Sequence, residues 1–113
     1  MTASLHLVVL RCVDVERARE FYEALGLRFE AEQHGFGPRH YSCDIAGVVL
    51  ELYPRSSPST AGLRLGFRVD SVPAVLAAIA RFGGRIASTS DTTTIVEDPD
   101  GHKVELVERD AQR

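Results

Sequence analysis

The chain has no tryptophan and contains only one methionine and two cysteines among its 113 residues. Cys12 and Cys43 are not spaced as a metal-binding pair, and so few thiols indicate a reducing, cytoplasmic environment. No apolar run approaches the roughly 20 residues that a membrane-spanning helix requires. The N-terminus also lacks a basic segment followed by an apolar core, so neither a membrane span nor a signal peptide is expected.

The chain also has no strong excess of charge of one sign. It contains 13 Lys and Arg residues and 16 Asp and Glu residues, which gives a net charge of −3. This mild acidity gives no electrostatic basis for binding nucleic acid or an anionic membrane. The apolar share of 44% and the charged share of 26% are those of an ordinary globular protein. A chain of this length is expected to form a single domain, residues 1–113.

Periodic patterns divide the chain into two similar halves. Each half is predicted to contain a strand, a helix and three further strands, and the two halves are joined by a linker of loop composition. Asp14 caps the first helix, and Asp70 or Ser71 caps the second. Module one (1–54) is predicted to have strands at 5–12, 27–32, 39–45 and 48–53 and a helix at 15–25. The linker covers 55–62. Module two (63–113) is predicted to have strands at 63–69, 85–89, 92–97 and 103–108 and a helix that ends near Phe82.

The most informative stretch is V-E-D-P-D-G-H-K-V-E-L-V at residues 96–107. Proline and glycine favour a tight reversal, so this stretch is predicted to be a strand, a turn and a return strand. Glu105 lies in the middle of the return strand, where it is either solvated or directed into a site. His102 follows the turn and is expected to be exposed.

Two segments carry a resemblance to a known family: L-R-C-V-D-V-E-R-A-R-E-F-Y-E-A-L-G-L at 10–27 and V-E-D-P-D-G-H-K-V-E-L at 96–106. The chain resembles the vicinal oxygen chelate superfamily, which includes glyoxalase I, extradiol dioxygenases, fosfomycin resistance enzymes and bleomycin resistance proteins. This resemblance implies an α+β fold, in which two βαβββ modules form a half-open curled β-barrel with the helices outside. It leaves the reaction undecided, because members bind or transform different small molecules.

The resemblance also implies four ligand positions for a divalent metal such as Zn, Ni, Mn or Fe, in the first and last strands of each module. In this chain the four positions hold Leu7, Glu51, Arg64 and Glu105. Leucine and arginine cannot ligate a metal. His6 lies one residue from the first position, so without a bulge it points to the opposite face. No metal is therefore favoured; if one binds, the expected ligands are His40, Glu51 and Glu105.

Alternation along the strands predicts the pocket on the concave side of this barrel. A two-residue turn at Ala46-Gly47 pairs Ser42 with Glu51 and leaves one face of the hairpin polar. Arg64 is expected to fork between Glu51 and Glu105, because buried carboxylates need a partner. The predicted ligand-binding residues are Leu7, His40, Ser42, Tyr53 and Arg64, and the candidate catalytic residues are Glu105 and Glu51.

Several functions are compatible with this pocket, and the sequence does not decide whether the chain is an enzyme. The first hypothesis is a metal-independent small-molecule-binding protein of the resistance or sequestration type. The second is a glyoxalase-like lyase, isomerase or dioxygenase, in which Glu105 or Glu51 acts as a general base. The third is a scaffold without a ligand. His40 is either an acid–base group, a replacement ligand or a polar residue at the barrel mouth, and the loop at His34 is either a lid or a plain connection. A homodimer that covers exposed sheet edges is expected.

Overall fold

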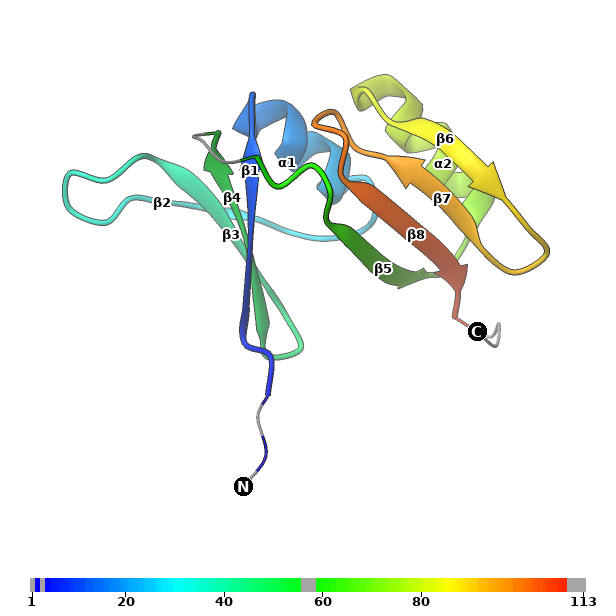
Figure 1. The fold of residues 1–113 in the computed structure, drawn as a ribbon, viewed down its shortest axis with the longest axis horizontal. Coiled ribbons are helices and arrows are strands. Elements are labelled where there is room, and N and C mark those ends of the chain that lie inside the picture. The colour runs from blue at the N-terminus through cyan, green and yellow to red at the C-terminus, as the bar shows by residue number, and fades with distance from the viewer. Residues whose placement is uncertain (1, 3, 56–58, 110–113) are drawn as a thin grey trace.

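The computed structural model describes residues 2, 4–55 and 59–109, which form two four-stranded sheets and two helices. Residues 56–58 of the expected linker, and the first and last residues of the expected modules, lie outside the described part. Figure 1 shows the two sheets side by side. The elements are β1 (Leu7–Cys12), α1 (Val15–Glu23), β2 (Glu30–Glu32), β3 (His40–Ile45), β4 (Val48–Pro54), β5 (Arg64–Val69), α2 (Val72–Ile79), β6 (Arg85–Thr89), β7 (Thr94–Glu97) and β8 (Lys103–Glu108).

Both sheets have the same internal order, β1-β4-β3-β2 in the first and β5-β8-β7-β6 in the second. The first and last strands of each sheet run parallel, as β1 with β4 and β5 with β8, whereas the other neighbours are antiparallel. A parallel neighbour requires a crossover, which the helix after the first strand begins. The predicted α+β fold of two βαβββ units is confirmed.

Local sequence signals explain where the helices begin and end. Asp14 caps α1 as expected, because its carboxylate accepts hydrogen bonds from the backbone of Glu16 and Arg17. The cap of α2 is Ser71 rather than Asp70, since the Ser71 hydroxyl accepts from the backbone of Ala74. The two helices end earlier than predicted, with a 3₁₀ turn at 80–82 after α2. Neither helix of the described chain is long and apolar enough to cross a membrane.

The hairpin between β3 and β4 has the predicted register, with Ser42 opposite Glu51. Its turn requires positive φ at two consecutive residues, and Ala46 and Gly47 adopt φ values of 52° and 93°. This register places the polar residues of both strands on the face that does not pack against α1. The opposite face contributes Tyr41, Leu50 and Leu52 to the core.

The two halves of the chain share one hydrophobic core, which includes Leu10, Phe21 and Tyr22 from the first half and Val69, Val104 and Leu106 from the second. The Tyr22 ring lies 6.3 Å from the Phe67 ring. The β7–β8 turn docks on the first half, where Asp100 accepts a 2.7 Å hydrogen bond from the Val13 backbone. The expectation that His102 is exposed is wrong, because this docking buries its side chain completely.

Candidate functional site

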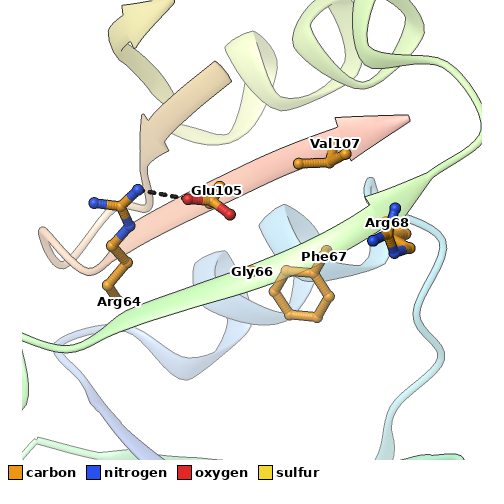
Figure 2. A pocket seen from close by; sticks show the side chains of 6 residues that line it. All are labelled: Arg64, Gly66, Phe67, Arg68, Glu105 and Val107. Atoms are coloured by element: carbon orange, nitrogen blue, oxygen red, sulfur yellow. Dashed lines mark hydrogen bonds and ion pairs between the residues drawn. The ribbon is translucent and has the colours of Figure 1, made fainter. Parts of the chain in front are cut away.

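A pocket of about 440 Å³ lies on the face of the second sheet that points away from the core. Side chains alternate along a strand, so every second residue of β5 and β8 faces it, and Phe67 is the one lining residue outside this alternation. The parallel register sets Gly66 opposite Glu105 and Arg68 opposite Val107. Figure 2 shows its lining residues: Arg64, Gly66, Phe67, Arg68, Glu105 and Val107.

An ion pair forms one end of this pocket, where Arg64 Nη2 lies 2.5 Å from Glu105 Oε1 (Figure 2). The Glu105 side chain is only 6% exposed, whereas the Arg64 side chain is 50% exposed. A buried carboxylate requires a charged or hydrogen-bonding partner, and the guanidinium supplies it. Arg64 has five N–H donors on a half-exposed side chain, so it can bind a ligand while it pairs with Glu105.

Gly66 keeps the floor of the pocket open next to this carboxylate. A Cβ atom added at Gly66 would lie 3.6 Å from Glu105 Oε2, in ordinary van der Waals contact. A side chain beyond Cβ would therefore cover the Glu105 carboxylate. The glycine therefore places no side chain between the pocket and the Glu105 carboxylate.

A second polar cluster lies on the first sheet, around the buried side chain of His40. The imidazole stacks on the Tyr53 ring, with 4.0 Å between the ring centroids and 11° between the planes. Its Nε2 atom lies 3.3 Å from Glu32 Oε1 and 3.7 Å from Glu51 Oε2. Burial and the neighbouring Glu51 carboxylate raise the pKa of the Tyr53 hydroxyl.

The sequence profile of the Glyoxalase/Bleomycin resistance protein/Dioxygenase superfamily matches residues 4–106. The chain belongs to this superfamily. No curated protein matches the chain significantly.

Solved structures of superfamily members resemble the chain along most of its length. The antibiotic-binding protein TnmS3 from Streptomyces sp. CB03234 is 26% identical, with a TM-score of 0.72, and the alignment covers 95% of this chain and 96% of that one. A glyoxalase/bleomycin resistance protein from the same strain is 27% identical, with a TM-score of 0.67 and coverage of 92% and 99%. The trypanothione-dependent glyoxalase I of Leishmania major is 20% identical, with a TM-score of 0.74 and coverage of 95% and 87%, and shows the fold alone.

Members of this superfamily often hold a metal, but the residues at the usual positions do not fit one here. Leu7 offers no donor atom, and Arg64 is a cation paired with Glu105. The described chain has two compact groups of metal-type side chains, and neither contains Glu51 or Glu105. The alternative ligand set of His40, Glu51 and Glu105 is therefore not assembled within the described chain.

The structure separates the predicted site residues between the two sheets. Leu7, His40, Ser42, Glu51 and Tyr53 lie on the first sheet, and Arg64 and Glu105 lie on the second. The expected fork of Arg64 is wrong for the described residues: Arg64 pairs with Glu105, and the carboxylate of Glu51 faces His40. The carboxylates of Glu51 and Glu105 each pair with a residue of their own sheet.

Glu32 is a neighbour of His40 that the strand pattern did not predict. Strand β2 pairs with β3 so that Glu32 lies directly opposite His40. The alternation rule would have found this contact if a register for β2 had been assigned. Nothing in the sequence placed His34 beside them, because its position depends on the path of the β2–β3 loop.

A third polar group, around Asp98, is buried in the core and is fully occupied by structural hydrogen bonds. The Asp98 carboxylate accepts from the Tyr22 hydroxyl, from His102 Nδ1 and from the backbone of Asp100 and His102. Burial and the nearby Asp98 carboxylate raise the pKa of Tyr22 well above its usual value. This group joins the two halves of the chain and leaves no lone pair directed at a ligand.

Proposed function

We propose that this chain binds a compact polar or planar small molecule, as in sequestration or resistance, without a metal at the usual superfamily position. The ion pair of Arg64 and Glu105 carries this proposal, because it occupies two of the four positions at which relatives hold a metal. The similarity to TnmS3, an antibiotic-binding protein, supports it.

The charge of the pocket favours a ligand with an anionic group. Arg64 and Arg68 contribute two positive charges to the lining, and Glu105 contributes one negative charge. An arginine guanidinium binds a carboxylate through two parallel N–H bonds and also stacks on planar groups. Phe67 and Val107 supply the apolar surface that a planar ligand needs.

The face of the first sheet that carries Leu7, His40, Ser42 and Tyr53 is proposed to form the second wall of the binding cavity. In a homodimer this wall would come from the same chain or from the partner subunit. Exposed apolar side chains near the strand edges, such as Leu5 and Leu7, support a proposed dimer that covers them.

An enzymatic role is the second candidate, and the position of the Glu105 carboxylate in the pocket lining favours it. A carboxylate at the floor of a pocket can remove a proton next to a carbonyl group, as a glyoxalase-like lyase or isomerase requires. A dioxygenase reaction would need a metal, for which the Arg64 position supplies no ligand.

Thermal shift with matched probe pairs tests the binding function. We expect planar aromatic carboxylates to raise the melting temperature and the corresponding carboxamides to have a much smaller effect. Arg64→Ala should abolish the difference within a pair, whereas Arg85→Ala, which removes an exposed arginine paired with Glu97, should preserve it. Equal shifts for both members of every pair, or an unchanged difference in Arg64→Ala, would overturn the proposal.

A further inference from the structure

Both ring nitrogens of His40 contact oxygen atoms. Its Nδ1 atom lies 3.2 Å from the carbonyl oxygen of Pro38. A carbonyl only accepts hydrogen bonds, so Nδ1 carries a proton in this contact. The Nε2 atom lies 3.3 Å from Glu32 Oε1, within hydrogen-bond distance, and 3.7 Å from Glu51 Oε2. In the neutral ring that carries its proton on Nδ1, the Nε2 lone pair faces both carboxylates, on a side chain that is 1% exposed.

His34 adds a fourth donor atom to this arrangement. Its Nε2 atom lies 3.7 Å from the same Glu32 oxygen. The ligand atoms of Glu32, His34 and His40 all lie within 4.8 Å of one another. Ligands placed about 2.0–2.2 Å from one ion lie roughly 3.0–3.6 Å apart, so small side-chain movements suffice to close the set.

We infer that Glu32, His34 and His40 form a binding site for one divalent transition-metal ion on the first sheet, which Glu51, 3.7 Å from His40 Nε2, can complete. Two neutral imidazoles and two carboxylates balance the charge of a divalent cation, which would also replace the repulsion among the facing acceptors by attraction. This donor set suits Zn²⁺, Fe²⁺, Co²⁺ or Mn²⁺ better than Mg²⁺ or Ca²⁺, which prefer oxygen ligands throughout.

The surroundings of His40 resemble those of a metal-bound histidine. Such residues donate the second ring N–H to a carbonyl or carboxylate, which fixes the tautomer and the ring orientation. Here the Pro38 carbonyl accepts that N–H, and the stacked Tyr53 ring holds the imidazole plane. The buried ligand is thus oriented before an ion arrives.

This site differs from the one that superfamily members use. Glu51 is at one of the four usual positions, but the other three donors come from β2, the β2–β3 loop and β3. It also lies on a different sheet from Arg64 and Glu105, and it shares only His40 with the second wall of the binding cavity proposed above.

Titration of the untagged full-length chain with Co²⁺ tests this inference, because coordinated Co²⁺ has visible d–d absorption that hydrated Co²⁺ shows only weakly. We expect one equivalent to bind and excess Zn²⁺ to displace it. Glu32→Gln and His34→Ala should each weaken binding by at least about 10-fold. Both side chains are at least partly exposed, so these variants should fold even if changes at buried His40 do not.

Matched controls remove the same residue types elsewhere. Glu30→Gln changes an exposed carboxylate of the same strand, and His6→Gln changes an exposed histidine. Both controls, and Arg64→Ala, should bind Co²⁺ like the parent chain. Absence of coordinated Co²⁺, binding that is unchanged in Glu32→Gln and His34→Ala, or equal loss in His6→Gln would overturn the inference.

Discussion

The Tyr22 hydroxyl donates a 2.7 Å hydrogen bond to the Asp98 carboxylate, across 76 positions of the sequence and in the interior of the protein. Tyr22 lies on α1, and Asp98 lies at the β7–β8 turn, so the bond fastens the second half of the chain to the first. His102 completes the connection, because its Nδ1 bonds to Asp98 and its Nε2 lies 2.6 Å from the Thr60 hydroxyl.

Removing one donor from this network should destabilise the whole fold. Tyr22→Phe leaves the buried Asp98 carboxylate short of one hydrogen bond, which should lower the free energy of unfolding by about 1–3 kcal/mol. Asp98→Asn should cost more, since it removes the charge that four donors share. Urea denaturation measures both effects, with Asp91→Asn in an exposed turn as the control, expected within about 0.5 kcal/mol of the parent. Parent-like stability of Tyr22→Phe would show that the network does not join the halves.

Asp100 should make stability fall as the pH rises. Burial, opposed by the hydrogen bond from the Val13 backbone, raises the pKa of Asp100 above its ordinary value of 3.8. The folded protein therefore holds a proton that the unfolded chain has lost, so stability decreases between pH 3.8 and the raised pKa. Asp100→Asn removes this term while its side-chain oxygen can still accept from Val13. Urea denaturation from pH 3.5 to 7 should show Asp100→Asn gaining stability relative to the parent, and a constant difference would contradict the assignment.

Glu105→Gln separates the two candidate functions. The substitution keeps the shape of the side chain but removes the negative charge of the pocket, so an anionic probe at Arg64 should bind about 5-fold more tightly, or about 1 kcal/mol. If Glu105 is a general base, the same variant should lose turnover of a substrate while it still binds that substrate.

Glu97→Gln is the matched control for this change. Glu97 is a carboxylate on the same sheet, paired with Arg85 and Lys103, whose hydrogen bonds lower the pKa of Glu97. Isothermal titration with a planar aromatic carboxylate should show tighter binding for Glu105→Gln alone. Equal tightening in both variants would assign the effect to overall charge rather than to the pocket.

The turn of the β3–β4 hairpin offers a test of backbone strain. Ala46 adopts a φ of 52°, a conformation that costs a residue with a Cβ atom about 1 kcal/mol. Ala46→Gly should therefore stabilise the protein by up to about 1 kcal/mol in thermal unfolding. The same substitution at Ala77, an exposed position inside α2, should destabilise it by a similar amount. A loss of stability at both positions would show that the turn is not strained.

The sequence by itself determined the fold, because its signals act over short distances. Alternation along strands, the helix cap at Asp14 and the turn at Ala46-Gly47 each reflect the preferences of neighbouring residues. The repeat of these signals in both halves predicted two similar sheets. Alternation along the strands also directed Arg64 and Glu105 towards one pocket, and the structure pairs them.

Tertiary structure alone decided which polar groups meet across the chain. His102 follows an ordinary turn, and its burial depends on the docking of that turn against α1 and Thr60. Likewise, the position of His34 beside Glu32 and His40 depends on the path of a loop. Local propensities fix the face of the sheet on which a side chain lies, whereas the packing of distant segments fixes its partners. For this reason the sequence predicted the sheets but not the clusters around His102 and around His34 and His40.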